Sequence, residues 1–565
     1  MKTLAELNQE NIERAKKDRN LAFTTYPELY DWFFPKPTVV KILIVTDGII
    51  DFGDGDFGLS ELLKALSVSP GPYVSFAVMK AHRAATADQA DILDFKFDNE
   101  SHFKPENYDE VWLFGIAKSG TSSALNDKEL RIITQFMDKG GGVFAVGDHQ
   151  DLGNALCARI PRVRSMRKWY FPYKGPNGEP VAPPVGIPDS DKPYDSSERN
   201  DTLREGHDSG FQFDDQSDDI PQEIIPTWYS RPQTNLDVVI KYPHPLLCGP
   251  RGVIKVLPDH MHEGECYVDE DLTRSFTFDG YTTKEYPILQ KTGKPLEPEV
   301  IAEATVIGDH KTYNPESPPT TAKVFGVLGA YNGHKVNVGR VAVDATWHHF
   351  ININIRGVAN GMSSIKQQGF NASEKGKAVY EDIKSYWRNL GTWLAPKPRQ
   401  TSMLEKALWV TRWSYPLSEE LSPRMFEQGL SSEGILYTGK VARRILENMS
   451  SKCLVRQFII YHLEPIEIIV DPWWPKPEPG PEHISDLIIK SVLGGMILSI
   501  VKEFPERSRE NKERAEKELS KVVAAGVPLG IEAAQETVRI SLRQIENVSS
   551  HLEKFAEIIQ QTSRQ

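Results

Sequence analysis

The sequence has few cysteines, and they lie far apart. Four occur in 565 residues, at positions 157, 248, 266 and 453, and no two form a Cys-x-x-Cys pair. This spacing excludes a disulfide framework and a cysteine-rich zinc module. Residues 1–37 are polar and helix-like at first and lack the apolar centre of a signal peptide. Together these features predict a reducing, cytoplasmic setting.

Long hydrophobic runs are also missing. The longest uncharged apolar run, Ser491–Val501, has eleven residues, whereas a helix that spans a bilayer needs about 20. A membrane-spanning segment is therefore not expected. Residues 522–531 are rich in small side chains, and Gly494 and Gly495 permit close helix packing. Membrane activity of this region is a weaker alternative to a buried helical core.

There is no excess of basic residues. Lys and Arg number 66 against 78 Asp and Glu, a net charge of −12. Broad binding to a phosphate backbone needs a basic surface, so nucleic acid is not an expected partner. The run RIPRVRSMRK, residues 159–168, is locally basic. We expect a solvated face there, with anion binding as the alternative.

Named catalytic and nucleotide-binding motifs are absent. The sequence contains no GxxxxGK[ST], no HExxH and no GxSxG. The glycines of residues 51–58, DFGDGDFG, do not have the strand–helix setting that a dinucleotide-binding GxGxxG motif needs. That acidic loop also lacks the length and the final Glu of a calcium-binding EF-hand loop, so we interpret it as a solvated turn. No motif identifies a cofactor.

Short apolar runs alternate with helical patterns in the first part of the chain. Val39–Gly48, Tyr73–Met79 and Glu110–Gly115 are expected strands. The segment Asn126–Lys139 has apolar residues at helical spacing, ends at three glycines, and precedes the expected strand Val143–Val146. This alternation predicts βαβ units and an α/β fold with a mostly parallel sheet.

Three regions follow from the pattern. Residues 1–37 form a helical lead-in, 38–395 an α/β domain, and 396–565 a mainly helical region with a proline-rich linker at 471–481. Within the α/β domain, about 160–240 is a long excursion, rich in Pro, Gly, Asp and Ser between 172 and 235. A stretch of this length without apolar runs is uncommon in a compact fold, and a lid is one function it could serve.

An apolar stripe marks the end of the chain. Its members recur at steps of three and four: Leu542, Ile545, Val548, Leu552, Phe555 and Ile559. Such a stripe suits a helical hairpin or a coiled coil. We expect it to pack within the chain, with a homo-oligomer through the C-terminal helices as the alternative.

Polar residues follow three of the expected strands. Asp47 follows the first strand, Asp148 and His149 follow the strand after the triple glycine, and residues 344–349 (DATWHH) follow a late strand. Ligands bind outside the carboxyl ends of strands in an open parallel sheet. If these strands are neighbours, their carboxylates and imidazoles meet at one edge.

Four histidines are candidate metal ligands. In an extended chain His260 and His262 share one face, which suits a divalent metal ion, with a nearby carboxylate as ligand or base. Hydrogen bonding within the fold is the alternative and the commoner role. His348 and His349 are adjacent, so one is expected to face the site while the other packs beneath it.

The order of these pieces resembles the ThuA-like (trehalose-utilisation-protein-like) family of the class I glutamine amidotransferase superfamily. The similar segments are FMDKGGGVFAVGDH (136–149), HPLLCG (244–249), HEGECY (262–267) and GRVAVDATWHH (339–349). The resemblance covers about 38–360, without 160–240, and implies a flavodoxin-like sheet with helices on both faces. The C-terminal helical region lies outside it.

The resemblance fails at the nucleophile. Amidotransferase relatives carry a cysteine on the turn where this chain has Gly147, Asp148 and His149, and Cys157 comes eight residues after that histidine. A cysteine-dependent glutaminase is therefore not expected. The sequence favours a hydrolase of a polar small molecule, with Asp148, His149 and Glu263 as catalytic residues. The histidines His260, His262, His348 and His349 would hold a divalent metal ion in a metal-assisted version.

A second hypothesis is a non-catalytic ligand-binding or scaffold protein, whose C-terminal helices form an interaction module. Loss of the family's nucleophile and the large appended helical region both favour it.

Overall fold

The computed structural model describes residues 36–71, 73–118, 121–148, 152–169, 222–232, 239–258, 264–306, 322–357, 369–414, 417, 431–449, 482–506 and 508–562. The expected N-terminal helix and the linker at 471–481 lie outside these residues, as does most of the excursion.

One eight-stranded sheet organises residues 38–393, which we call the α/β body. Its strand order is β2-β1-β3-β4-β18-β17-β16-β6. The first five strands are parallel: β2 (Val74–His82), β1 (Thr38–Thr46), β3 (Glu110–Phe114), β4 (Gly142–Val146) and β18 (Val341–Asp344). The antiparallel strands are β17 (Lys323–Tyr331), β16 (Glu299–Val306) and β6 (Ile225–Pro226). The order of the five parallel strands is that of a flavodoxin-like sheet, so the predicted fold class is confirmed.

The central strands are apolar because both of their faces are covered. Every residue of β3 and β4 is buried, and in β1 only Val39 and Lys41 are exposed. Continuous hydrophobic runs of this kind are typical of parallel strands between two helical layers.

The helix before β4 has clear end signals. Helix α4 (Asp127–Asp138) begins with a capping box, in which Asn126 accepts from backbone amides and Glu129 reaches back to the amide of Asn126. It ends before Gly140, whose φ of +100° suits glycine alone.

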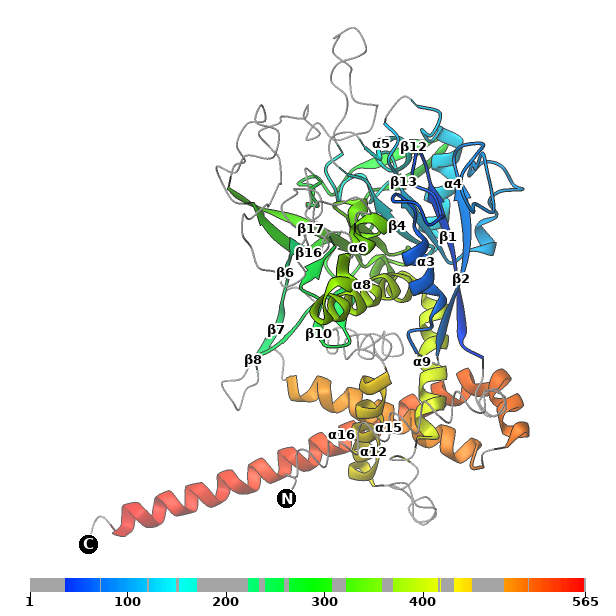
Figure 1. Cartoon of the computed structure of the whole chain (residues 1–565). Coiled ribbons are helices and arrows are strands. Elements are labelled where there is room, and N and C mark those ends of the chain that lie inside the picture. The colour runs from blue at the N-terminus through cyan, green and yellow to red at the C-terminus, as the bar shows by residue number, and fades with distance from the viewer. Residues whose placement is uncertain are drawn as a thin grey trace.

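Helices cover both faces of the sheet. Helix α8 (Glu374–Trp393) lies on one face, where Gly391 permits close contact with Ile42 and Phe76. Helix α3 (Ser60–Ser67) packs beside α8. Right-handed crossovers place α4 on the opposite face, because the chain moves in opposite directions along the sheet from β1 to β2 and from β3 to β4. Figure 1 shows these helices around the sheet.

Smaller elements connect this framework. They are η1 (Pro105–Asn107), α5 (Asn154–Cys157), β5 (Gln222–Glu223), β7 (Tyr229–Pro232), β8 (Val239–Tyr242), η3 (Pro245–Leu247), β9 (Cys248–Gly249), β10 (Gly252–Val253), β11 (Val256–Leu257), β12 (Ser275–Phe278), β13 (Tyr281–Lys284), β14 (Ile288–Leu289), β15 (Lys294–Pro295), η4 (Gly333–Val336), η5 (Trp347–His349), α6 (Asn352–Arg356) and η6 (Gly369–Ala372).

The basic run at 159–168 is not a solvated face, so that expectation is wrong. Arg162, Arg164 and Arg167 are buried. Arg162 pairs with Asp138 at 2.6 Å, and the Arg164 guanidinium lies 4.1 Å from the centre of the Phe276 ring. Ion pairs, aromatic rings and carbonyl groups thus take the place of water around these side chains.

The described residues of the C-terminal region form the helices α9 (Lys397–Arg412), α12 (Ser432–Met449), α15 (Glu482–Glu503) and α16 (Arg509–Thr562). The apolar run Ser491–Val501 lies in α15 and is largely buried against α12 and α16. Glycines allow this packing, because Gly494 abuts the backbone of α12 and Gly495 abuts Gly526 and Gly530 of α16. Among the helices described, none combines the length and the apolar character needed to cross a bilayer.

The end of α16 differs from the prediction. Leu542, Ile545, Val548 and Leu552 are 54%, 64%, 58% and 62% exposed, so in this chain the stripe is not an intramolecular core. In Figure 1 this part of α16, drawn in red, extends away from the rest of the molecule toward the C-terminus. The sequence pattern identified a helix with an apolar face but not what covers that face.

Candidate functional site

The carboxyl ends of β1, β3, β4 and β18 lie side by side at one edge of the sheet. Asp47 follows β1, Asp148 follows β4 one residue after Gly147, and Asp344 ends β18. The neighbouring strands therefore bring three of the singled-out carboxylates to the edge where ligands bind in such sheets. We call this edge the carboxyl rim.

His348 faces Asp148 across two neighbouring strand ends. Its Nε2 lies 3.5 Å from Asp148 Oδ2, and its Nδ1 lies 2.9 Å from Asn354 Oδ1. The Thr346 hydroxyl donates to Asp148 Oδ1 at 2.6 Å. The Asp148 side chain is fully buried, whereas that of His348 is 10% exposed. The imidazole is thus fixed from both sides and keeps some access to solvent.

His349 packs beneath this pair. Its Nδ1 lies 2.7 Å from Asp344 Oδ1, and the Tyr386 hydroxyl from α8 donates to Asp344 Oδ2 at 2.8 Å. The three side chains are buried, and burial together with Asp344 raises the pKa of Tyr386 well above its usual value. This cluster joins β18 to α8. Of the two adjacent histidines, His348 therefore faces the rim and His349 lies below it.

Arg167 holds the ends of β4 and β18 together. Its guanidinium donates to the carbonyls of Asp148 and Ala345, both at 2.7 Å, and to the carbonyl of Asp344 at 3.2 Å. It lies 4.4 Å from the centre of the Trp169 ring. A buried arginine with these bonds fixes the backbone that carries Asp148 and His348.

Asp47 occupies the point where the strand order reverses, between β1 and β3. Its Oδ1 accepts from the backbone amides of Ile116 at 2.6 Å and Ala117 at 2.9 Å, while its Oδ2 has no hydrogen-bond partner among the described residues. Burial raises the pKa of Asp47 to about 6, although these amides and Arg83 act in the opposite direction.

His82, at the end of β2, is a second buried polar group near this point. Its Nδ1 accepts from the Ala84 amide at 2.9 Å, and its Nε2 has no partner in the described part of the chain. Burial lowers the pKa of His82, so the neutral imidazole is favoured.

Cys157 is a packed thiol rather than a nucleophile. It lies in the four-residue helix α5, is fully buried, and its Sγ is 3.8 Å from the Val146 carbonyl. Burial, with a contribution from Asp47, raises the pKa of this thiol well above its ordinary value. The thiolate form that a cysteine nucleophile needs is therefore disfavoured.

The acidic glycine loop after β1 is held by the helix that follows His349. Asn352 donates to the carbonyls of Gly53 at 3.1 Å and Gly55 at 2.8 Å. Arg356 pairs with Asp54 at 2.8 Å, and this pairing, with a hydrogen bond from Ser60, lowers the pKa of Asp54 to about 2. Asp54 itself is exposed, as expected for a turn, but it serves to dock the loop on α6.

Several predicted site residues lie outside the described part of the chain: His149, His260, His262 and Glu263. Their roles as base or metal ligands remain predictions. The described chain resumes at Gly264, which lies against the Ala345 carbonyl and Arg167. Within the residues that the structure describes, no three His, Cys, Asp or Glu side chains are grouped as a metal ion would require.

Some residues of the rim had no signal in the sequence. In the sequence, Asn354 of α6 and Tyr386 of α8 do not directly follow a strand. Only the fold shows that Asn354 contacts His348 and that Tyr386 contacts Asp344. Thr346 lay within the highlighted segment 344–349, but nothing marked its hydroxyl as a partner of Asp148. Asp47 was noticed at the end of the first strand, yet its burial could not be inferred there.

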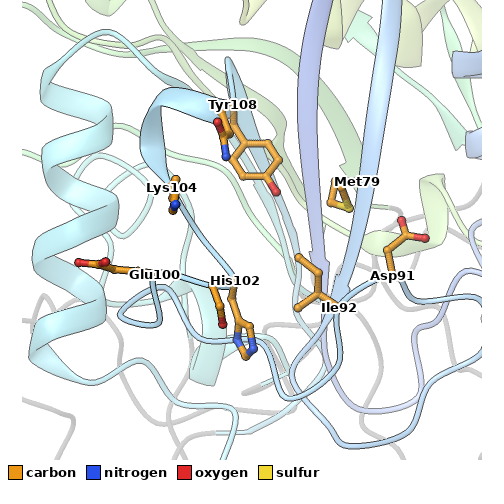
Figure 2. Close-up of a pocket in the computed structure, with 9 residues that line it drawn as sticks. Met79, Asp91, Ile92, Glu100, His102, Lys104 and Tyr108 are labelled. Carbon is orange, nitrogen blue, oxygen red and sulfur yellow. The ribbon is translucent and has the colours of Figure 1, made fainter.

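A surface hollow lies elsewhere, beside the edge strand β2. It has a volume of about 670 Å³, and Figure 2 shows its lining side chains, including Met79, Asp91, His102 and Tyr108. Asp91 accepts from the Lys80 amide and His102 from the Lys96 amide, so these polar groups stabilise local turns. The hollow contains none of the carboxyl-rim residues, and we assign it no chemistry.

Compared with protein-family models, with curated proteins and with solved structures, the chain matches none.

Proposed function

We propose that the protein is a hydrolase of a polar small molecule, with His348 as the proton-transferring residue at the carboxyl rim. One observation carries the proposal: His348 lies between Asp148, after β4, and Asn354 of α6, with part of the imidazole open to solvent. Histidine is the commonest general base and acid in enzymes, because its ordinary pKa lies close to neutral pH.

Each neighbour of His348 has a distinct role in this proposal. Asn354 Oδ1 accepts a hydrogen bond from the N–H group at Nδ1 of His348, which leaves Nε2 as the basic nitrogen. Asp148, near Nε2, stabilises the imidazolium that forms when a proton is taken from water or substrate. Thr346 holds the Asp148 carboxylate in place through its hydroxyl. The substrate is polar because these groups bind by hydrogen bonds and charge.

A metal-assisted version of this reaction is a further proposal. It needs ligands from His260 and His262, with His348 or His349, and a carboxylate such as Glu263; the metal would supply an activated water. Because Nδ1 of His348 and Nδ1 of His349 each already have a side-chain partner, only the second ring nitrogen of either could bind a metal. Metal analysis of the purified chain, repeated after His260→Ala with His262→Ala, tests this version.

The test of the hydrolase proposal is a set of chromogenic nitrophenyl esters, phosphates and glycosides. We expect turnover of at least one class, and a fall in kcat of about 10²- to 10⁴-fold in His348→Ala, since general acid–base catalysis is typically of this size. Asp148→Asn should also lower kcat. His102→Ala, in the hollow beside β2, is the matched control and should leave the rate unchanged.

Two results would contradict the proposal. One is no turnover of any class by the native chain; the other is full activity in His348→Ala. Either would favour the second candidate, a non-catalytic ligand-binding or scaffold protein with a C-terminal interaction module. The exposed stripe on α16 is the observation that favours that candidate.

Three further proposals accompany the reaction. The order of the five parallel strands supports distant relationship to the ThuA-like family, although it is shared by other flavodoxin-like proteins. The net charge of −12 supports a small-molecule ligand over nucleic acid. The described cysteines Cys157, Cys248 and Cys266 are buried and form no disulfide with one another, which supports a reducing, cytoplasmic setting.

A further inference from the structure

The last part of α16 is a helix without a packing surface in its own chain. From Ser541 to Lys554 every residue is exposed, and no described residue covers the apolar stripe. In Figure 1 the same segment stands clear of the α/β body. An isolated helix of this length is marginally stable in water, and its apolar side chains gain nothing from exposure. The segment therefore requires a partner.

The stripe has the spacing of a coiled-coil seam. Val538, Ile545 and Leu552 recur every seven residues, and Ile559 continues the series in the sequence. Leu542 lies on the same face, between Val538 and Ile545. A seven-residue repeat of apolar positions is the pattern of helices that wrap around each other. A second helix with the same repeat would cover the apolar residues of this seam.

Charge favours a partner in the opposite direction. Arg539 lies just before the segment and Arg543 in its first part, and Glu546 and Glu553, followed by Lys554, lie in its second part. Arg539 and Glu553 are two heptads apart (553 − 539 = 14), so they lie on the same flank of the seam. In an antiparallel pair Arg539 of each copy comes beside Glu553 of the other, whereas a parallel pair brings like charges together.

We propose that the end of α16 forms an antiparallel coiled coil with α16 of a second copy of this chain. Leu542 of one copy then packs beside Leu552 of the other, and both stripes leave water. A membrane surface is a poorer occupant, because membrane-bound amphipathic helices carry Lys and Arg beside the apolar face. Here Glu546 and Glu553 lie beside the apolar face together with Arg539, so its border is of mixed charge and does not favour an anionic surface.

Sedimentation velocity of the full chain over a concentration series tests the proposal. The expected species has twice the chain mass of 63.7 kDa. Ile545→Lys combined with Leu552→Lys should sediment as a monomer with unchanged folding of the α/β body by near-ultraviolet circular dichroism. Asn547→Lys, on the opposite face of the same helix, is the matched control and should remain a dimer.

Charge reversal tests the direction of the pair. Arg539→Glu alone or Glu553→Arg alone should weaken the dimer about two- to fivefold, the usual size for exposed ion pairs. The two together should restore it, because the antiparallel pair is rebuilt with reversed signs. A native chain that stays monomeric at every concentration overturns the dimer, and a double variant that fails to recover overturns the antiparallel direction. Flotation of a monomeric native chain with anionic vesicles would also overturn the proposal, if this flotation is lost in the variant that combines Ile545→Lys with Leu552→Lys.

Discussion

Asp47 shows how one side chain combines a structural cost with a candidate function. Its carboxyl group is fully buried, two backbone amides bind one oxygen, and the other oxygen has no partner among the described residues. Burial of an ionised carboxylate is costly, which is why the pKa of this group rises to about 6. A residue of this kind at the reversal point of the strand order is typical of ligand sites.

Asp47→Asn is expected to change the pH dependence of stability. Because the folded pKa of about 6 exceeds the unfolded value of 3.8, the native chain loses stability as pH rises through this interval. The amide cannot ionise, and its oxygen can still accept from Ile116 and Ala117. The variant should gain up to about 3 kcal/mol over the native chain above pH 6, since each pKa unit corresponds to about 1.4 kcal/mol. Near pH 4 the difference should be small.

Denaturant unfolding of both chains at pH 4.5 and 7.5 measures this change. Comparing the two chains at each pH cancels the titration of all other groups. A stability difference that is the same at both pH values would show that the Asp47 carboxyl is not the group that titrates.

At the scale of secondary-structure elements, the C-terminal helices depend on glycine. A Cβ on Gly530 would lie within 3 Å of the backbone of Ser491 and Val492 in α15. Gly530→Ala should therefore lower the free energy of unfolding by about 1–3 kcal/mol, the usual cost of overpacking. This loss is expected even though alanine favours a helix by about 1 kcal/mol.

The control for this substitution is Gly55→Ala. Gly55 lies in the acidic loop with open space around the position of a Cβ, so its stability should change by about 0.5 kcal/mol or less. Both variants can be compared by thermal and denaturant unfolding. A stabilised Gly530→Ala chain would mean that α15 and α16 are not in backbone contact.

The predictions from sequence succeeded where a local pattern determines the element. The strand Val143–Val146 and the helix Asn126–Lys139 are found as β4 and α4, because unbroken apolar runs, caps and glycines act within a few residues. Strand ends also located Asp148 and His348 correctly at one edge. The prediction of a solvated face at 159–168 was wrong because charge alone does not reveal partners distant in sequence, such as Asp138 for Arg162.

The prediction that the apolar stripe of α16 packs within the chain was wrong for a related reason. Leu542 and Ile545 have the spacing of a buried helix face, and spacing is the same whether the covering surface belongs to this chain or to another. The partners of His348 illustrate the limit for sites: Asn354 is six residues away, in the next helix, and no motif connects the two. Contacts that depend on tertiary packing are not encoded in a local pattern.

At the scale of the whole molecule, α9 joins the α/β body to the C-terminal helices, as Figure 1 shows. Near its first turn, the Ser402 hydroxyl bonds with Thr38 of β1 at 2.8 Å, and Arg399 pairs with Asp109 at 3.0 Å. Toward its other end, Trp409 is buried with its ring 5.2 Å from that of Phe504, just beyond α15. One helix thus makes structural contacts with both parts.

This arrangement predicts that the two parts unfold as one unit, and Trp409→Ala tests it. Removing a buried tryptophan should cost about 3–5 kcal/mol. If α9 couples the parts, hydrogen exchange should increase both in β1, residues 38–46, and in α15, residues 489–501. Trp228→Ala, at an exposed tryptophan, is the control and should leave both segments protected. Faster exchange confined to 489–501 would mean that the helices open independently of the α/β body, because the contacts of Ser402 and Arg399 with β1 and Asp109 would then survive the loss of Trp409.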